Sequence, residues 1–202
     1  MIETKSICLS LPVNQAGAVF NFTEADNLHW AGIVDLPAHH RLPLETNARN
    51  DLYIVCGELI EGTDTTHSAG TFISRHPNAV LTAGAGGVRL FLYRDRCTKS
   101  EDEATVVPGG LRWYEGRGTG MKIAPIRESP QQLMLVSWVR GTQMRFHRHP
   151  HGEELLVLAG ELCDPRGRYP AGTWQRLHPG AGHSPYSETE TLILLRNGHL
   201  RP

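Results

Sequence analysis

The stretch Leu52-Tyr-Ile-Val-Cys-Gly-Glu-Leu59 returns later in the chain as Leu155-Leu-Val-Leu-Ala-Gly-Glu-Leu162, with Gly57 lying 103 positions before Gly160. Further matches follow in the same order at a separation of 102: Ala69-Gly-Thr71 with Ala171-Gly-Thr173, His76-Pro77 with His178-Pro179, and Leu90-Phe-Leu-Tyr93 with Leu192-Ile-Leu-Leu195. Several short matches in one order are hard to obtain by chance. They indicate two tandem copies of one structural module.

The pattern within each copy is that of β-strands. Apolar segments are short and end at Gly, Pro, Asn or Asp, and no stretch keeps apolar residues at helical spacing for three turns. Many short strands separated by turns predict an all-β chain of two tandem sandwiches or barrels. Because Thr98–Thr105 is charged and polar, it suits a solvated connection, so we expect units at residues 1–104 and 105–202.

Composition excludes several classes of protein. The 202 residues are 40% hydrophobic with a formal net charge of −1, and no run of Lys or Arg could neutralise adjacent phosphates, so we expect no nucleic-acid binding. No apolar stretch approaches the roughly 20 residues that span a bilayer, so we expect no membrane association. Without a convincing secretory signal, a cytoplasmic location is the default. The cysteines (Cys8, Cys56, Cys97 and Cys163) form no CxxC pair and receive no role.

The segment Phe146-His-Arg-His-Pro-His-Gly-Glu-Glu154 concentrates metal-ligating residue types. His147 and His149 are two apart, so on a strand they face the same side and can share one ion. Glu153 keeps the same parity. His183, in the glycine-rich turn Pro179-Gly-Ala-Gly-His-Ser-Pro185, is expected to reach the ion from across the barrel. These four residues are the predicted metal ligands.

Two neighbours compete for the same role. His151 also shares parity with His147 and His149, and Glu154 replaces Glu153 if the turn changes the register. The repeat does not choose between them. Borderline cations accept this mixture of nitrogen and oxygen, so Zn²⁺ or Fe²⁺ is favoured, with Ni²⁺ and Mn²⁺ as alternatives.

The spacing Gly141-x5-His147-x-His149-x3-Glu153-x6-Gly160 resembles the first motif of cupins, and Pro179-x-Ala-Gly-His183 resembles the second. The run from His147 to Thr173 is similar to the cupin domain of ChrR-type anti-sigma factors. That resemblance implies a cupin jelly-roll barrel in which His147, His149, Glu153 and His183 bind one divalent metal ion. With the repeat, it predicts a bicupin.

Departures from the ChrR pattern limit what the resemblance carries over. This chain has His151 where the family usually has a small residue. The zinc-binding anti-sigma domain of ChrR proteins has a His-x3-Cys-x2-Cys pattern that is absent here, so anti-sigma activity is not transferred. Aligning the first repeat on Gly57 places Leu44, Thr46 and Asn50 at the ligand positions and Leu81 opposite His183, which predicts a degenerate site. His39 and His40 are expected to be surface or turn histidines, and His76 and His178 structural turn residues.

Three functions are compatible with these residues. The first is a metal-binding sensor or ligand-binding module of the kind used in oxidative-stress or transcription regulation, with a small-molecule ligand. The second is a small metal-dependent dioxygenase of the diketone-cleaving type. A purely structural metal ion is the least favoured, because structural zinc sites are usually closed by four Cys or His ligands. Phe146, Met134, Trp138 and Trp174 are candidates for barrel or entrance side chains, and both a homodimer and a compact pseudo-dimer fit the expected edge strands.

Overall fold

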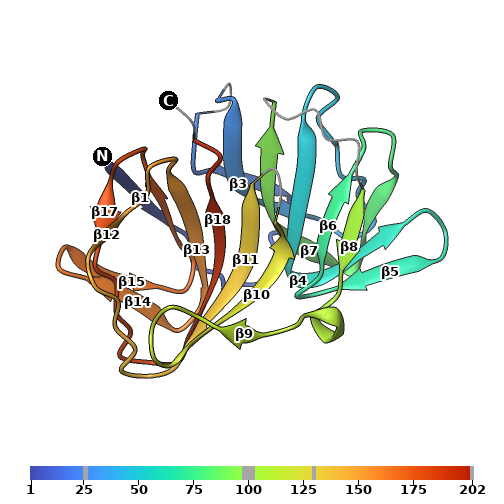
Figure 1. Cartoon of the computed structure of the whole chain (residues 1–202). Coiled ribbons are helices and arrows are strands. Elements are labelled where there is room, and N and C mark those ends of the chain that lie inside the picture. The colour runs from blue at the N-terminus through green and yellow to red at the C-terminus, as the bar shows by residue number, and fades with distance from the viewer. Residues whose placement is uncertain (25–26, 97–102, 129–130, 201–202) are drawn as a thin grey trace. The chain divides into compact units, whose positions relative to one another are not determined.

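The computed structural model describes residues 1–24, 27–96, 103–128 and 131–200. These residues form eighteen β-strands and a single short helix, the three-residue 3-10 turn η1 (Pro108–Gly110), so the all-β prediction is confirmed (Figure 1). Accordingly, no helix in the described part of the chain has the length and apolar character needed to cross a bilayer. Cys97 and most of the expected connection Thr98–Thr105 lie outside the described residues.

The chain divides into two compact units, which we call the N-terminal unit (Leu11–Gly110) and the C-terminal unit (Met1–Ser10 with Leu111–Pro202). In the N-terminal unit the antiparallel strands follow the order β2-β3-β7-β4-β6-β8, and β5 pairs with β4. These strands are β2 (Ala18–Asn21), β3 (His29–Leu36), β4 (Arg49–Glu61), β5 (Thr65–Ser68), β6 (Phe72–Arg75), β7 (Leu81–Asp95) and β8 (Ala104–Val106).

In the C-terminal unit a seven-stranded antiparallel sheet has the order β1-β16-β13-β18-β11-β10-β9, and two small pairs, β12-β17 and β14-β15, complete the fold. These strands are β1 (Ile2–Ser6), β9 (Tyr114–Glu115), β10 (Met121–Arg127), β11 (Gln132–Trp138), β12 (His147–Arg148), β13 (Glu153–Ala159), β14 (Glu161–Asp164), β15 (Gly167–Pro170), β16 (Thr173–Leu177), β17 (Gly182–His183) and β18 (Thr191–Asn197).

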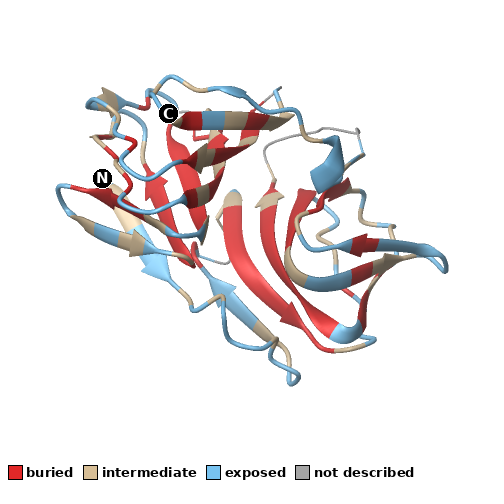
Figure 2. Ribbon diagram, turned by 90° about the horizontal axis from the view of Figure 1, so that it is seen from below, coloured by how far each residue is buried: buried red, intermediate tan, exposed pale blue. Residues whose placement is uncertain are grey.

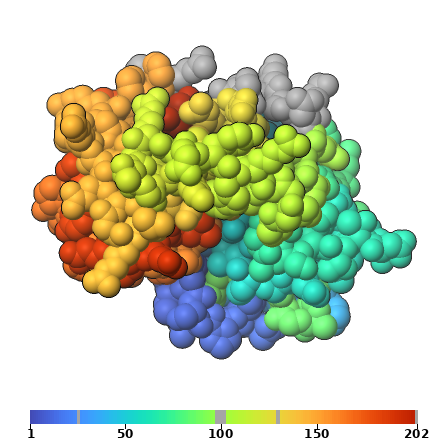
Figure 3. Space-filling view, turned by 60° about the horizontal axis from the view of Figure 1, so that its bottom comes forward, coloured from blue at the N-terminus to red at the C-terminus, as the bar shows by residue number. Residues whose placement is uncertain are grey.

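Burial follows these strands. In Figure 2 the buried residues (red) concentrate on the long strands of each sheet, whereas the connecting loops are mostly exposed. The segment around β9, yellow-green in Figure 3, lies at the molecular surface, where Trp113 and Tyr114 are 41% and 52% exposed.

The first ten residues are placed differently from the sequence expectation of units at 1–104 and 105–202. Strand β1 pairs with β16 from Ile2↔Leu177 to Ser6↔Thr173 and so extends the sheet of the C-terminal unit. The N-terminal unit ends at Gly110 instead of residue 104, because β8 pairs with β6. Pairing between strands far apart in sequence leaves no local signal, so the repeat alone could not place β1.

The two units share a strand register. Strands β4 and β7 pair with a register shift between Ile54 and Cys56, and β13 and β18 pair with a shift between Val157 and Ala159, 103 positions later. Such a β-bulge adds one residue to one strand of a pair. The bulge therefore stands at the same place in both copies.

This register corrects one detail of the sequence alignment. Ile54 pairs with Leu90 and Val157 with Ile193, so the last strands also correspond at a separation of 103, not 102. Leu90 of β7 is therefore the counterpart of Ile193 of β18, and Leu92 is the counterpart of Leu195. All four residues are apolar. An alignment shifted by one residue in this run therefore still matches apolar residues with apolar residues.

The glycines that recur in the repeated segments Leu52–Leu59 and Leu155–Leu162 are required for steric reasons. Gly57 and Gly160 both have positive φ values, 82° and 71°. A Cβ atom at Gly57 would lie 2.2 Å from the Gly87 carbonyl oxygen, and one at Gly160 would lie 2.0 Å from the Glu190 carbonyl oxygen. Both positions therefore require glycine.

Candidate metal centre

Three histidines meet in the C-terminal unit. His147 lies on β12 and His183 on β17, and the two are direct antiparallel partners. The ring centroid of His149 lies 4.8 Å from that of His147 and 5.1 Å from that of His183, and the centroids of His147 and His183 are 4.7 Å apart. His183 is thus beside His147, not across the barrel as the sequence suggested, because β12 and β17 form their own two-stranded pair.

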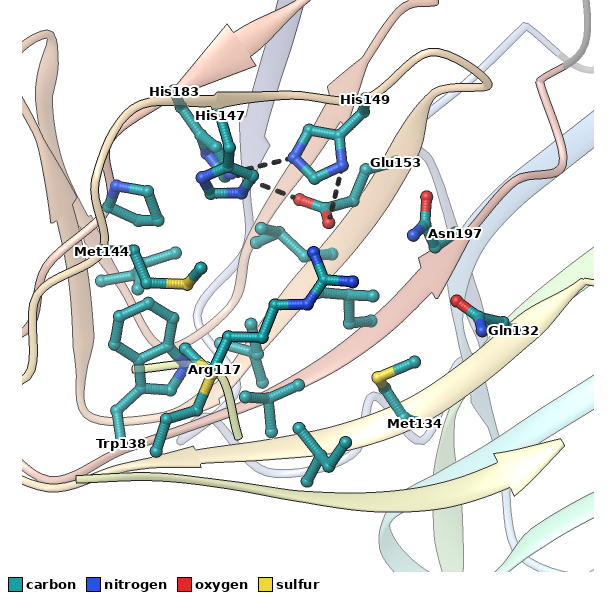
Figure 4. Close-up of a pocket in the computed structure, with 18 of the residues that line it drawn as sticks. Arg117, Gln132, Met134, Trp138, Met144, His147, His149, Glu153, His183 and Asn197 are labelled. Carbon is teal, nitrogen blue, oxygen red and sulfur yellow. Dashed lines mark hydrogen bonds and ion pairs between the residues drawn. The ribbon is translucent and has the colours of Figure 1, made fainter. Parts of the chain in front are cut away.

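Glu153 joins the cluster from the first position of β13 (Figure 4). Its Oε2 lies 3.3 Å from Nδ1 of His149, and its Oε1 lies 3.6 Å from Nε2 of His183. The Nε2 atoms of His149 and His183 are 3.2 Å apart. Three imidazoles and one carboxylate therefore converge on one small volume.

Three of the four groups, His149, Glu153 and His183, are buried, whereas His147 is partly exposed. Burial lowers the pKa of His149 to about 4 and that of His183 to about 3, with the neighbouring His147 as a second cause. Burial also raises the pKa of Glu153 to about 8. In each case burial disfavours the charged form of the group, because few opposite charges or hydrogen bonds nearby stabilise it.

The cluster suits a metal cation. Because their pKa values are lowered, His149 and His183 are neutral at pH 7 and keep lone pairs for coordination, and Oε1 of Glu153 is buried with no hydrogen-bond partner among the described residues. Nδ1 of His147 lies 3.0 Å from the carbonyl oxygen of Arg145. Because a carbonyl oxygen only accepts, Nδ1 is the donor of that hydrogen bond, and this leaves Nε2 to face a metal ion, an arrangement typical of metal-binding histidines.

The two competing residues lie elsewhere. The side chain of His151 is exposed in the turn before β13. Glu154 is fully buried and forms ion pairs with Arg176 and with His199, the latter at 2.9 Å. The charges of these partners lower the pKa of Glu154 to about 2 against the opposing effect of burial. Adjacent residues of β13 face opposite sides of the sheet, so Glu153 and Glu154 have separate surroundings.

A cavity of about 430 Å³ adjoins the cluster within the C-terminal unit. Its lining is mainly apolar and includes the three internal methionines of the chain: Met121, Met134 and Met144. Asn197 and Gln132 add amide groups, and they lie in one row with Glu153 across β13, β18 and β11. The cluster thus forms one end of a largely apolar chamber.

Two of the four predicted lining residues face this cavity. Met134 and Trp138 line it. Phe146 does not, because its side chain is 60% exposed, with the guanidinium of Arg148 stacked 5.4 Å from its ring centre. Trp174 is fully buried in β16 and also does not line the cavity.

Sequence reasoning missed Arg117, Gln132 and Asn197 as lining residues. Arg117 lies in the loop between β9 and β10, in the run Glu115-Gly-Arg-Gly-Thr-Gly120. An isolated arginine among glycines carries no ligand-spacing signal. Gln132 and Asn197 stand at strand ends and become neighbours only through the β11-β18 register.

The corresponding positions of the N-terminal unit offer no comparable donor set. Leu81 is fully buried, Leu44 packs against the apolar core, and Thr46 is exposed. The buried amide of Asn50 is used locally, since its nitrogen donates to the carbonyl oxygen of Glu45 at 3.0 Å. Within the described ranges, His147, His149 and His183 are the one group of three or more His, Cys, Asp or Glu residues close enough to share an ion.

The remaining histidines that the sequence singled out lie in turns. His39 and His40 are exposed in the turn after β3, and His39 has a positive φ of 63°. His76 and His178 each directly precede a turn at the end of a strand. Their expected role as surface or turn residues agrees with these positions.

Comparison with known proteins places this fold among the cupins. A cupin 2 conserved barrel domain protein from Leptotrichia buccalis superposes with a TM-score of 0.64 at 15% identity, over 95% of this chain and 98% of its own. A putative dioxygenase from Nostoc punctiforme has a TM-score of 0.74 at 12% identity, over 100% and 81%. A mutant of the Bacillus subtilis oxalate decarboxylase has a TM-score of 0.69 at 10% identity, over 99% and 78%. These likenesses establish the fold alone.

The family follows from the sequence of the second half. Residues 101–201 match the model of the ChrR cupin-like domain, and the chain belongs to that family. No curated protein matches the chain at a significant level. The protein is thus a cupin with a metal-binding type of fold and a three-histidine cluster.

Proposed function

We propose that the C-terminal unit binds one divalent metal ion through His147, His149, Glu153 and His183. The observation that carries this proposal is the buried Oε1 of Glu153, which has no hydrogen-bond partner among the described residues and lies 3.6 Å from Nε2 of His183. A buried carboxylate without a counter-charge is costly, and a divalent cation at this place offsets that cost. Zn²⁺ and Fe²⁺ are the favoured ions, with Ni²⁺ and Mn²⁺ as alternatives.

The place of the cluster favours a working site over a purely structural one. Structural zinc sites are usually closed by four Cys or His ligands, whereas this cluster includes a carboxylate and borders a cavity of about 430 Å³. Bound there, such an ion supplies Lewis acidity and open coordination positions to a molecule in the cavity. The lining of the cavity is mainly apolar, and the row of Glu153, Asn197 and Gln132 would orient polar groups of that molecule.

The function supported best is therefore metal-dependent binding of a small organic molecule, in a module of the sensing or regulatory kind. Membership in the ChrR cupin-like family supports the regulatory context. The chamber itself supports the ligand, because pockets for small molecules are typically apolar with a few polar groups placed at one end.

A second candidate is a small metal-dependent dioxygenase of the diketone-cleaving type. The observation in its favour is the same cluster of three histidines and one carboxylate at the end of a mainly apolar chamber. The fold likeness to a putative dioxygenase is compatible with it.

For the whole chain we propose a tandem cupin in which the N-terminal unit is a second barrel with a degenerate site. The shared register and the shared bulge support this reading. The N-terminal unit then has a structural role, since its counterpart positions hold Leu44, Thr46, Asn50 and Leu81.

Elemental analysis of untagged protein purified without added metal tests the metal site. We expect about one equivalent of metal per chain, and protein that stays metal-free after incubation with each candidate ion would refute the site. Oxygen uptake by the Fe²⁺ form with a panel of small diketones then separates the candidates. Substrate-dependent uptake makes the protein an oxygenase, and ligand binding without turnover identifies a binding module.

A further inference from the structure

Arg117 gives the cavity a positive charge that the metal cluster does not use. Its side chain extends along the cavity with the guanidinium directed toward Glu153 and Asn197 (Figure 4). No described residue forms a hydrogen bond or ion pair with this guanidinium. An arginine over an apolar wall with an unused fork of donors is well suited to a planar anion.

The other charged lining residues are already engaged. Arg148 donates through Nη1 to the carbonyl oxygen of Gly180 at 2.8 Å and stacks on Phe146. Glu153 belongs to the histidine cluster and is the sole carboxylate among the described lining residues. Once a divalent cation is bound, the lining carries a net positive charge, and this charge favours an anionic ligand.

The rest of the lining defines the body of that ligand. Met121, Met134 and Met144 present flexible, polarisable side chains that adapt to different apolar shapes. Trp138 is 3% exposed, and its indole N–H has no acceptor among the residues that the structure describes. An oxygen atom of a bound molecule would satisfy a donor of this kind.

We propose that the cavity takes a small organic acid, with its carboxylate held by Arg117 and its apolar body lying on the methionine-lined wall. This inference rests on the proposed function and adds to it the chemical class of the ligand and the residue that selects it. Arg117 is a specificity-determining residue. The metal-binding cluster would contact the same carboxylate end of the ligand.

The test compares acids with neutral molecules of the same shape. Benzoate and isovalerate are titrated into the zinc-incubated full chain by calorimetry, alongside benzamide and isovaleramide. Because charge-assisted hydrogen bonds to a carboxylate are strong, Arg117→Met should weaken binding of the acids about tenfold to a hundredfold and leave the amides unchanged. Arg117→Lys, which keeps the charge but loses the fork, should give an intermediate loss.

Arg112→Met is the matched control, because Arg112 is exposed in the same unit and does not line the cavity. It removes the same charge and should leave acid binding as in the wild type. The proposal is overturned if no acid binds the wild-type protein, if acids and amides bind equally, or if Arg117→Met and Arg112→Met behave alike.

Zinc content is measured on the same samples, so the two proposals fail separately. Wild-type protein without bound zinc refutes the metal site. Protein with one equivalent of zinc that does not distinguish acid from amide refutes the carboxylate recognition alone.

Discussion

Strands β7 and β18 show how one framework gives two different interiors. In the N-terminal unit Leu90 and Leu92 of β7 belong to a fully buried apolar core. Their counterparts in the C-terminal unit, Ile193 and Leu195 of β18, line the cavity next to the histidine cluster. The bulge and the register around it are the same in both units. The register of this strand pair is therefore not what separates the two interiors, whereas the pair β12-β17, which carries His147 and His183, belongs to the C-terminal unit.

A second contrast concerns two carboxylates, the partly exposed Glu61 and the buried Glu153. In the N-terminal unit Glu61 receives two donors from Arg75 and one contact from His67, and the hydrogen bonds from Arg75 are the main reason that its pKa falls to about 2. In the C-terminal unit Glu153 has no such cation, and burial raises its pKa to about 8. A carboxylate that the fold leaves uncompensated marks a binding site more clearly than one that it neutralises.

The largest expected effect is the loss of the metal ion. His147→Ala combined with His149→Ala removes two of the four donors, and we expect stoichiometric metal to disappear while circular dichroism still reports an all-β fold. The matched variant, His39→Ala with His40→Ala, should keep its full metal content. Metal retained in the first variant would refute the ligand assignment.

The next effect is on stability. An ion that binds only the folded protein stabilises it by about 4 kcal/mol when free metal is a thousandfold above the Kd. Denaturant unfolding with and without zinc should show this difference in the wild type and none in the double histidine variant. Equal zinc effects in both proteins would mean that the ion binds outside the cluster.

A smaller effect should separate the two interiors. Leu92→Ala leaves a void in a packed core and should cost about 2–5 kcal/mol of unfolding free energy. Leu195→Ala, at the counterpart position, enlarges an existing cavity and should cost only about 1 kcal/mol, because fewer packing contacts are lost. Chemical denaturation of the two variants provides the comparison, and equal losses would argue that the C-terminal chamber is as tightly packed as the N-terminal core.

The smallest effect concerns pH. Because the pKa of Glu61 in the folded protein lies below its ordinary value of 4.5, its contribution to stability is present above that value and is lost as the pH falls toward about 2. Glu61→Gln should therefore flatten the loss of stability between about pH 5 and pH 2. Glu58→Gln, at an exposed position of the same strand, is the control. A profile unchanged by Glu61→Gln would mean that the pair with Arg75 contributes little.

The sequence predicted the class of the fold because its signals are local. Short apolar segments and turn glycines such as Gly57 and Gly160 appear directly in the chain. The pairing of β1 with β16 and the position of the bulge did not, because they depend on contacts between segments distant in sequence. The one-residue error in aligning the last strands has the same origin.

The site was predictable in part for similar reasons. The spacing of His147, His149 and Glu153 is a local pattern, and the structure brings them together with His183. The direct pairing of His147 with His183, and the approach of Arg117 to the cavity, arise from loops and strand pairs that carry no spacing signal. The exposure of Phe146 also could not be read from an apolar residue beside a ligand motif.

The central claim is tested most directly by a crystal structure of the zinc-incubated protein with data collected above and below the zinc absorption edge. We expect one anomalous peak per chain, about 2.0–2.2 Å from a nitrogen of each of His147, His149 and His183 and from an oxygen of Glu153. A peak elsewhere, or an ordered cluster with no peak, would contradict this claim.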